Sequence, residues 1–238
     1  MESIYTHISR QYDAELEDIR SRVLQMGGLV EKHIVEAITA LIKGDIALAQ
    51  EVIKNDYRVN NLDVTIDEEC GQIIARHQPL ASDLRLVVAV IKIITDLERI
   101  GDEAEKIARM AMRLANEERP ADGYLEIYAL GNHVRQMVHG ALDAFARLDI
   151  EAALRVARED RQADKGYKGV VRQKIIFMME DPRTISRSLD VIWAARALER
   201  IGDHACNICE HVIYLVKGKD IRHTSLDEVE QEILGRKC

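Results

Sequence analysis

The feature that most constrains this chain is a five-residue segment that occurs twice. Residues 98–102 read Glu-Arg-Ile-Gly-Asp, and residues 199–203 repeat them letter for letter. The neighbours match in part, since Asp-Leu precedes the first copy and Ala-Leu the second. Such a recurrence indicates an internal duplication. In each copy the Glu and the Asp are four residues apart, which places both carboxylates on one face of an α-helix.

Composition favours a wholly helical protein. The chain has 238 residues, of which only 3 are proline and 4% are aromatic, and 47% are hydrophobic. Residues with good helix propensity, such as Ala, Leu, Glu and Arg, dominate. A chain of this length can bury a sizeable core without disulfides or metals.

Hydrophobic spacing of three and four residues predicts six long helices. The first three span roughly residues 11–43, 45–76 and 84–116, and the second half replays them at 124–148, 149–179 and 184–217. Gly44 and Asp45 are typical of a helix stop followed by an N-cap, and Leu148 and Asp149 occupy the same place in the second half. We expect an all-α fold of two tandem repeated three-helix bundles, with six long antiparallel helices.

The linker and the tail set the expected boundaries. Residues 119–123, Arg-Pro-Ala-Asp-Gly, form the clearest linker in the sequence. We therefore assign the first bundle to residues 1–118, the second to 119–218 and a polar C-terminal tail to 219–238.

Paired acidic positions occur in both halves, on the helix that precedes each motif. Asp56 and Asn60 in the first half correspond to Asp160 and Asp164 in the second, again four residues apart. If each pair lies beside its motif, four oxygen-bearing side chains surround one spot in each half. The candidate positions are Asp56, Asn60, Glu98 and Asp102 in the first half, and Asp160, Asp164, Glu199 and Asp203 in the second.

A rotation of 100° per residue predicts where these carboxylates face. Glu98 and Asp102 fall close together, whereas Ile100, Ala104 and Ile107 cluster on the opposite side of the helix. The second motif repeats this pattern. The rotation therefore predicts two acidic faces directed outward, away from the core.

Two interpretations of these faces remain open at this point. A solvated charged surface is the ordinary one, because helices commonly carry charge on the outside. Against it, like charges four residues apart destabilise a helix unless something offsets them, and here the pattern is duplicated. Clustered carboxylates suit hard or borderline cations such as magnesium, manganese, calcium, or iron in an oxygen-bridged cluster.

Other classes of function lack support. The net charge of −8 argues against nucleic acid as a main partner. No P-loop, G-x-S-x-G or H-E-x-x-H motif is present, so nothing in the sequence indicates an enzyme. Cys206 and Cys209 form a single C-x-x-C, for which helix-packing thiols are a simpler explanation than zinc. The N-terminus has no signal-peptide pattern, and the eight histidines form no i, i+4 pair.

The duplicated motif and four further segments resemble the PhoU family of bacterial phosphate-specific transport. The segments are residues 66–70 (Ile-Asp-Glu-Glu-Cys), 81–86 (Ala-Ser-Asp-Leu-Arg-Leu), 178–185 (Met-Met-Glu-Asp-Pro-Arg-Thr-Ile) and 216–223 (Val-Lys-Gly-Lys-Asp-Ile-Arg-His). The resemblance extends over nearly the whole chain.

This resemblance implies a cytoplasmic, often homodimeric protein without catalytic activity. It implies that the chain couples the phosphate ABC transporter, through its ATPase subunit, to a membrane sensor histidine kinase, and so keeps phosphate-starvation genes off when phosphate is plentiful. Contact with the membrane would be peripheral, through those partners. A helical bundle for metal storage or metal-dependent chemistry is the alternative function.

The resemblance also implies metal binding at the paired acidic motifs. Iron, zinc, manganese or magnesium are the candidate ions. Asn60 stands where a stricter pattern has an acid, so we expect the first site to bind metal less tightly than the second. Asp63, one turn further on, is the residue able to compensate.

Overall fold

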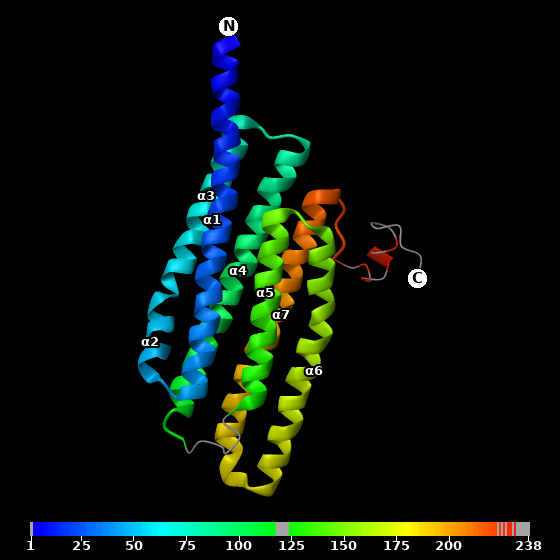
Figure 1. Ribbon diagram of the computed structural model, residues 1–238. Helices are drawn as coiled ribbons and strands as arrows, with labels where there is room; N and C mark the ends of the chain where they lie inside the picture. Colours follow the sequence, from blue (N-terminus) through cyan, green and yellow to red (C-terminus); the bar gives the residue numbers. More distant parts are fainter. Residues whose placement is uncertain are drawn as a thin grey trace.

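The computed structural model describes residues 2–117 and 124–222, together with residues 224, 226, 228, 229 and 231. The predicted linker at 119–123 and most of the tail beyond residue 222, including Cys238, lie outside the described residues. What is described is helical and elongated, and the helices run side by side along a common direction (Figure 1).

Seven α-helices and one 3-10 turn make up residues 2–217 of the described chain. They are α1 (Glu2–Lys43), α2 (Ile46–Asn55), α3 (Tyr57–His77), α4 (Ala81–Leu114), α5 (Leu125–Arg147), α6 (Ile150–Glu180), η1 (Pro182–Thr184) and α7 (Ile185–Lys217). The prediction of an all-α protein with two repeated three-helix units is confirmed. The first unit is α1, α2–α3 and α4, and the second is α5, α6 and α7.

The middle helix of each unit begins at the predicted N-cap. The carboxylate of Asp45 accepts a hydrogen bond from the backbone N–H of Leu48 at 3.0 Å, and that of Asp149 accepts one from Ala152 at 2.9 Å. Before each cap the chain turns through a left-handed residue, Gly44 (φ 66°) or Leu148 (φ 54°). A carboxylate at this position also interacts favourably with the positive end of the helix dipole.

One helix that the sequence predicts as continuous is broken in the structure. The helix expected over 45–76 is divided at Asp56 into α2 and α3, whereas its counterpart α6 is continuous. Asp56 keeps helical dihedral angles (φ −57°, ψ −37°), so the division is a local break and not a loop. It lies where Asp56 and Val59 meet Gly101 of α4. Neither proline nor glycine occurs there, so hydrophobic periodicity gave no sign of it.

The core is centred on the two motif-bearing helices, α4 and α7. Both are lined with fully buried apolar side chains, which include Ile93, Leu97, Ile100, Ile107, Leu198, Ile201, Ala205 and Ile208. α4 and α7 pack against each other in the middle of the molecule, with α2–α3 at one edge and α6 at the other (Figure 1). Burial of this apolar surface is the main stabilising contribution to the fold.

Among the described residues, no helix combines the length and apolar character needed to cross a membrane.

Candidate metal-binding sites

The two motifs meet near the centre of the α4–α7 contact. Asn207 donates a hydrogen bond to Asp96 at 3.0 Å, and the guanidinium of Arg200 lies 3.2 Å from Glu103. As the residue number rises by seven along α4, it falls by seven along α7, so the helices are antiparallel. Gly101 and Gly202 therefore lie at the same level, and the two candidate sites face opposite sides of the molecule.

The first site is built around a close approach of α3 to α4. A Cβ added at Gly101 would lie 3.4 Å from Oδ1 of Asp56 and 3.3 Å from a methyl of Val59. Glycine thus lets the buried carboxylate of Asp56 sit directly against the motif. Asp56 Oδ2 accepts a hydrogen bond from the Asn60 amide at 3.2 Å, whereas the buried Oδ1 has no hydrogen-bond partner.

The second site repeats this arrangement between α6 and α7. A Cβ added at Gly202 would lie 3.7 Å from Oδ1 of Asp160 and 3.5 Å from Ala163. Oδ1 of Asp160 is again buried without a hydrogen-bond partner, and so is Oε2 of Glu199. The motif glycine therefore makes room for the neighbouring helix at Gly101, whereas at Gly202 an alanine Cβ would meet Asp160 and Ala163 at ordinary contact distances.

The prediction that the acidic faces point away from the core needs correction. Asp56 is only 8% exposed and Glu199 only 6%, while Glu98, Asp102, Asp160 and Asp164 are half-buried. Asn60 and Asp203 are exposed. Helical rotation correctly separates the carboxylates from the apolar face of their own helix. It does not account for the adjacent helix, which covers one side of each acidic face. We call the line along which the two helices meet at each site a groove.

Basic side chains partly neutralise each site. In the first, Arg99 of the motif lies 3.3 Å from Glu98 and 3.7 Å from Asp102. In the second, Lys168 pairs with Asp164 at 2.8 Å and Arg196 pairs with Glu199. The motif arginines consequently differ in role, because Arg200 reaches across to Glu103 on the other repeat.

Burial, and after it the neighbouring acidic charge, raises the pKa of several site carboxyls. Burial is the main cause for Asp56, followed by the charges of Glu105 and Asp102. Burial is likewise the main cause for the raised pKa of Asp160, followed by Asp203 and Asp164. The pKa values of Glu98, Glu199 and Asp203 are raised as well, first of all by burial. A raised carboxyl pKa means that a negative charge at the site is costly unless a cation offsets it.

The donor chemistry fits a hard cation, although no site is preformed. Among the described residues, no three His, Cys, Asp or Glu side chains converge in a geometry that would hold a metal ion. Each groove nevertheless offers carboxylates from two helices, and both contain a buried carboxylate oxygen without a partner. Binding would require the exposed acids, such as Asp203, to rotate toward the buried ones. Oxygen donors of this kind suit magnesium, manganese or iron.

Asp63 lies near the first site as well. It is half-buried on α3, and its charge contributes to the raised pKa of Glu98. The position is thus consistent with the expectation that Asp63 could add a carboxylate that Asn60 lacks.

Cys206 and Cys209 lie as helix-packing thiols on α7. Cys209 is fully buried, and Cys206 lies with its thiol 3.9 Å from the carbonyl oxygen of Ala157. Burial raises the pKa of both thiols, so both stay protonated near neutral pH.

Sequence reasoning missed a polar cluster between the repeats. Asp96, at 8% exposure, accepts hydrogen bonds on Oδ1 from Nδ1 of His204 (2.8 Å) and from Asn207, and on Oδ2 from Nε2 of His211 (3.1 Å). Burial alone would raise the pKa of Asp96, but these hydrogen bonds lower it below the ordinary value. The three partners are spaced i, i+3 and i+7 on α7, a pattern that an i, i+4 search overlooks.

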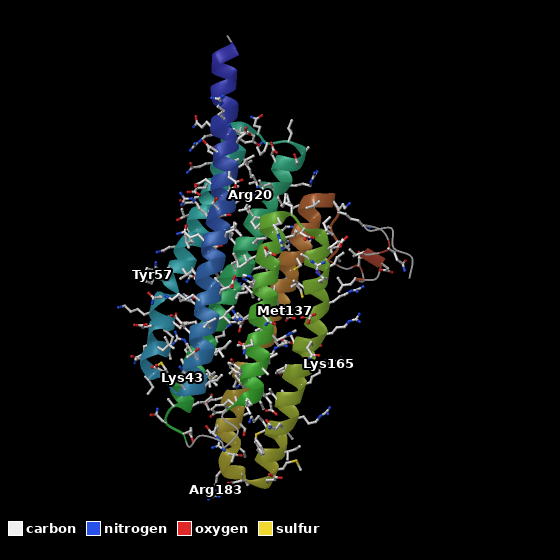
Figure 2. All side chains as sticks on the ribbon, in the orientation of Figure 1. Arg20, Lys43, Tyr57, Met137, Lys165 and Arg183 are labelled. Carbon is white, nitrogen blue, oxygen red and sulfur yellow. The ribbon has the colours of Figure 1, made fainter. Side chains whose placement is uncertain are left out.

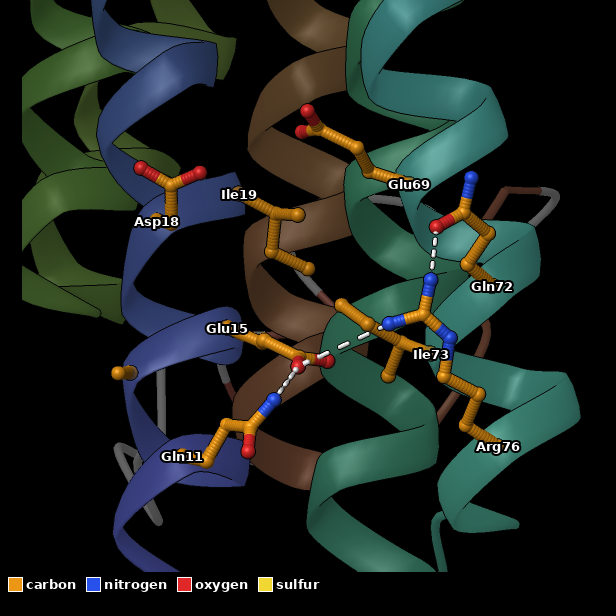
Figure 3. Close-up of a pocket in the computed structure, with 9 residues that line it drawn as sticks. Gln11, Glu15, Asp18, Ile19, Glu69, Gln72, Ile73 and Arg76 are labelled. Carbon is orange, nitrogen blue, oxygen red and sulfur yellow. Dashed lines mark hydrogen bonds and ion pairs between the residues drawn. The ribbon is translucent and has the colours of Figure 1, made fainter.

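A separate hollow of about 510 Å³ lies between α1 and α3 and contains none of the predicted residues. Figure 3 shows its acidic side chains, with Glu15 near Arg76. Glu15 also accepts a hydrogen bond from Gln11 at 3.2 Å, and Arg22 pairs with both Asp18 (2.8 Å) and Glu69 (3.2 Å). The charges are therefore largely paired, and no nucleophile stands beside a base.

Comparison with known proteins gives a consistent result. The PhoU domain matches residues 23–111 and again residues 127–212. The chain is 55% identical over 98% of its length to the phosphate-specific transport system accessory protein PhoU homolog of Pseudomonas putida, and covers 91% of that protein. It is 50% identical over 97% of its length to PhoU of Escherichia coli K12, covering 95% of that protein.

The structural comparison agrees with the sequence comparison. The crystal structure of PhoU from Pseudomonas aeruginosa superposes with a TM-score of 0.84 at 54% identity, over 87% of this chain and 100% of that one. The duplicated motif, the two three-helix units and the length of the match lead to one conclusion: this chain belongs to the PhoU family, whose members are accessory and regulatory proteins and not enzymes.

Proposed function

We propose that this protein is a non-enzymatic negative regulator of the phosphate-starvation response, which also modulates phosphate uptake. The observation that carries the proposal is the near full-length identity of 50–55% to proteins named for the phosphate-specific transport system. The site chemistry supports it, because the described carboxylates and histidines form clusters of a kind suited to binding.

In this proposal the partners are a phosphate ABC transporter, contacted at its ATPase subunit, and a membrane sensor histidine kinase. The protein acts in the cytoplasm as a homodimer and reaches the membrane through these partners. When phosphate is abundant, the transporter-bound regulator holds the kinase in a state that does not activate its response regulator. A net charge of −8 supports protein partners over nucleic acid.

A deletion strain tests the proposal. Without the protein, alkaline phosphatase or another starvation-induced enzyme should stay high in phosphate-rich medium, and a plasmid copy should restore repression. Pull-down from detergent-solubilised membranes should recover the transporter ATPase and the kinase. Unchanged repression in the deletion strain, combined with no recovery of either partner, would refute the proposal.

We propose a second property, which is cation binding at the two grooves. Asp56, Glu98 and Asp102 would hold one ion, with Asn60 as a weaker ligand, and Asp160, Asp164, Glu199 and Asp203 would hold the other. The buried oxygens without partners on Asp56, Asp160 and Glu199 favour this assignment. A bound cation would offset the carboxylate charge and fix the middle helix of each repeat against its motif helix. A metal-storage bundle is the alternative function that the same grooves would serve.

Metal analysis of purified protein distinguishes these possibilities. The wild type should retain manganese or iron after dialysis, and Asp160→Asn/Glu199→Gln should lose the ion of the second groove. The matched variant Asp56→Asn/Glu98→Gln should lose the ion of the first. If both variants lose metal and still repress in the deletion strain, metal is dispensable for signalling. A stoichiometry well above two ions per chain would favour storage.

A further inference from the structure

The two edges of the molecule, formed by α6 and by α2–α3, differ in their surface charge. Six exposed cations and three exposed acids lie on α6: Arg155, Arg158, Arg161, Lys165, Lys168 and Arg172 against Glu151, Glu159 and Glu180. The corresponding α2–α3 face is balanced, with Lys54, Arg58 and Arg76 against Glu51, Asp67 and Glu68. A protein with a net charge of −8 thus presents a locally basic edge.

Five of these cations form one line, which we call the basic stripe: Arg158, Arg161, Lys165, Lys168 and Arg172. Their spacing of i, i+3, i+7, i+10 and i+14 confines them to about 80° of the helix circumference and about 21 Å of its length. Lys168 pairs with Asp164. Figure 2 shows Lys165 on the edge of the molecule away from Tyr57, which lies at the α2–α3 edge. α6 packs chiefly on α5 and α7, so its outer side faces solvent.

Exposed apolar side chains continue the same line beyond the stripe. Ile176 and Met179 lie on its axis, at 48% and 79% exposure, and Ile175 flanks them at 45%. Arg196 of α7 lies over the ring of Tyr167 on α6. Because α6 and α7 are antiparallel, Trp193 is then level with the end of the stripe. Trp193 is 62% exposed. Exposed apolar residues that gather in one place usually mark an interaction surface.

The internal duplication provides a comparison for this surface. When Asp160 is aligned with Asp56, the stripe positions correspond to Lys54, Tyr57, Asn61, Val64 and Glu68. The apolar positions Ile175, Ile176 and Met179 correspond to Gly71, Gln72 and Ala75. The second repeat alone therefore combines the basic line with the apolar end, although both repeats keep the acidic groove residues.

We propose that, in addition to the contact through partner proteins, the outer face of α6 docks directly onto an anionic phospholipid membrane, with the basic stripe over the headgroups and Ile176 and Met179 entering the interface. The stripe runs straight along α6, which lies at one edge of the bundle where a flat surface can reach it (Figure 1). Charge complementarity selects anionic lipid, and the apolar side chains in line with the cations distinguish a bilayer from a purely polar polyanion. The balanced α2–α3 edge would face away from the membrane.

Sedimentation with vesicles tests the proposal on the purified full chain, without transporter or kinase, and so independently of the proposed function. Vesicles of phosphatidylcholine with 30% phosphatidylglycerol (about one anionic lipid in three) should bind the protein, and pure phosphatidylcholine vesicles should not. Binding should weaken as salt is raised, because exposed charges are screened. Arg161→Gln/Lys165→Gln should lower the partition coefficient roughly thirtyfold, since each basic residue contributes about a factor of five to six.

The first repeat offers a matched control. Lys54→Gln/Arg58→Gln removes the same charge from the opposite edge and should leave binding nearly unchanged. Met179→Ser should lower binding roughly threefold through the lost apolar contact, whereas Leu80→Ser, which alters an equally exposed residue at 79%, should not. All four variants change exposed side chains, and their helical circular dichroism should match the wild type.

Three results would overturn the proposal. One is the absence of binding to the anionic vesicles at low salt. Another is an equal loss of binding in the stripe variant and its control, which would mean attraction without a defined face. In the third, the stripe variant loses binding only to purified transporter or kinase embedded in phosphatidylcholine, while bare anionic vesicles do not bind. The stripe would then be a docking surface for protein.

Discussion

The middle helices of the two repeats occupy the same place in the fold and yet differ in several respects. In the first repeat the helix is divided at Asp56, and in the second it runs unbroken past Asp160. Four residues after this aspartate, the first repeat has the neutral Asn60 and the second has the acidic Asp164. Both repeats nevertheless keep a buried carboxylate oxygen without a hydrogen-bond partner against the motif glycine.

Comparing the two middle helices shows which features both repeats keep. The repeats differ in whether the helix is continuous, in its exposed charges and in one of the acids. Both keep the juxtaposition of an aspartate with a glycine on the neighbouring helix. We therefore regard the Asp–Gly contact as the centre of each groove, and the surrounding acids and arginines as features that adjust it.

The largest expected effect concerns Asp96, whose counterpart in the second repeat is Ala197. Asp96→Ala would make the two repeats alike at this position and leave His204 and His211 without their buried partner. We expect a loss of about 3 kcal/mol in the free energy of unfolding, because removing one member of a buried polar network is costly. Urea denaturation followed by circular dichroism measures it. Asp96→Asn, which keeps a hydrogen-bond acceptor, should lose less, and equal losses would contradict this account.

The next effect concerns the difference between Asn60 and Asp164. Exchanging the two residue types should exchange the affinities of the grooves: Asn60→Asp should tighten the first by about tenfold and Asp164→Asn weaken the second by a similar factor. Isothermal titration with manganese, on protein in which the other groove carries the Asp→Asn and Glu→Gln changes, measures each site alone. Affinities that do not respond to either exchange would place the ion elsewhere.

A smaller effect separates the two motif glycines. In metal-free protein, Gly202→Ala should stabilise the fold by about 1 kcal/mol, because alanine favours a helix and its Cβ meets Ala163 at an ordinary 3.5 Å. Gly101→Ala should gain less or nothing, since its Cβ would press on Val59 at 3.3 Å. Thermal unfolding of the two variants gives the comparison. If Gly202→Ala also weakens metal binding, the space beside Asp160 is functional.

The smallest effect is a dependence on pH at the second groove. The pKa values of Asp160 and Glu199 are raised in the folded protein, mainly by burial, so the folded state binds more protons than the unfolded one in mildly acidic solution. Their charge therefore destabilises the fold near neutral pH, and this penalty is relieved as the pH falls toward the ordinary values of 3.8 and 4.5.

The variant Asp160→Asn/Glu199→Gln isolates this contribution. Relative to the variant, metal-free wild type should gain about one or two degrees in Tm as the pH is lowered from neutral. Subtracting the variant removes the opposite contribution of Asp96, whose lowered pKa makes its stabilisation decline in acid. A difference in Tm between wild type and variant that stays constant with pH would show that folding does not raise the pKa values of the two carboxyls.

Much of the fold could be predicted because it depends on local signals. Asp45 and Asp149 mark helix starts through their own side chains, and the three- and four-residue spacing of apolar positions sets the helices and their core faces. The groove residues could be located because the duplication repeats them. Rotation about one helix axis also separates Glu98 and Asp102 correctly from Ile100 and Ile107.

The remaining features depend on neighbours that one helix cannot reveal. Glu199 is buried because α6 lies over it, and rotation around α7 contains no information on where α6 lies. The division at Asp56 occurs at a residue with helical dihedral angles and no proline or glycine nearby. Asp96 meets His204 and His211 only because α4 and α7 are antiparallel and in a particular register.

The antiparallel contact of α4 with α7 has a consequence for the origin of the chain. Two helices that cross with equivalent residues, Gly101 and Gly202, at one level are arranged as in a twofold-symmetric homodimer. A single ancestral three-helix unit could have formed the same core by pairing with its own copy. In a single polypeptide, equivalent positions near the axis can differ, as Asp96 with its two histidine partners differs from Ala197. Strict symmetry would have imposed every such change twice.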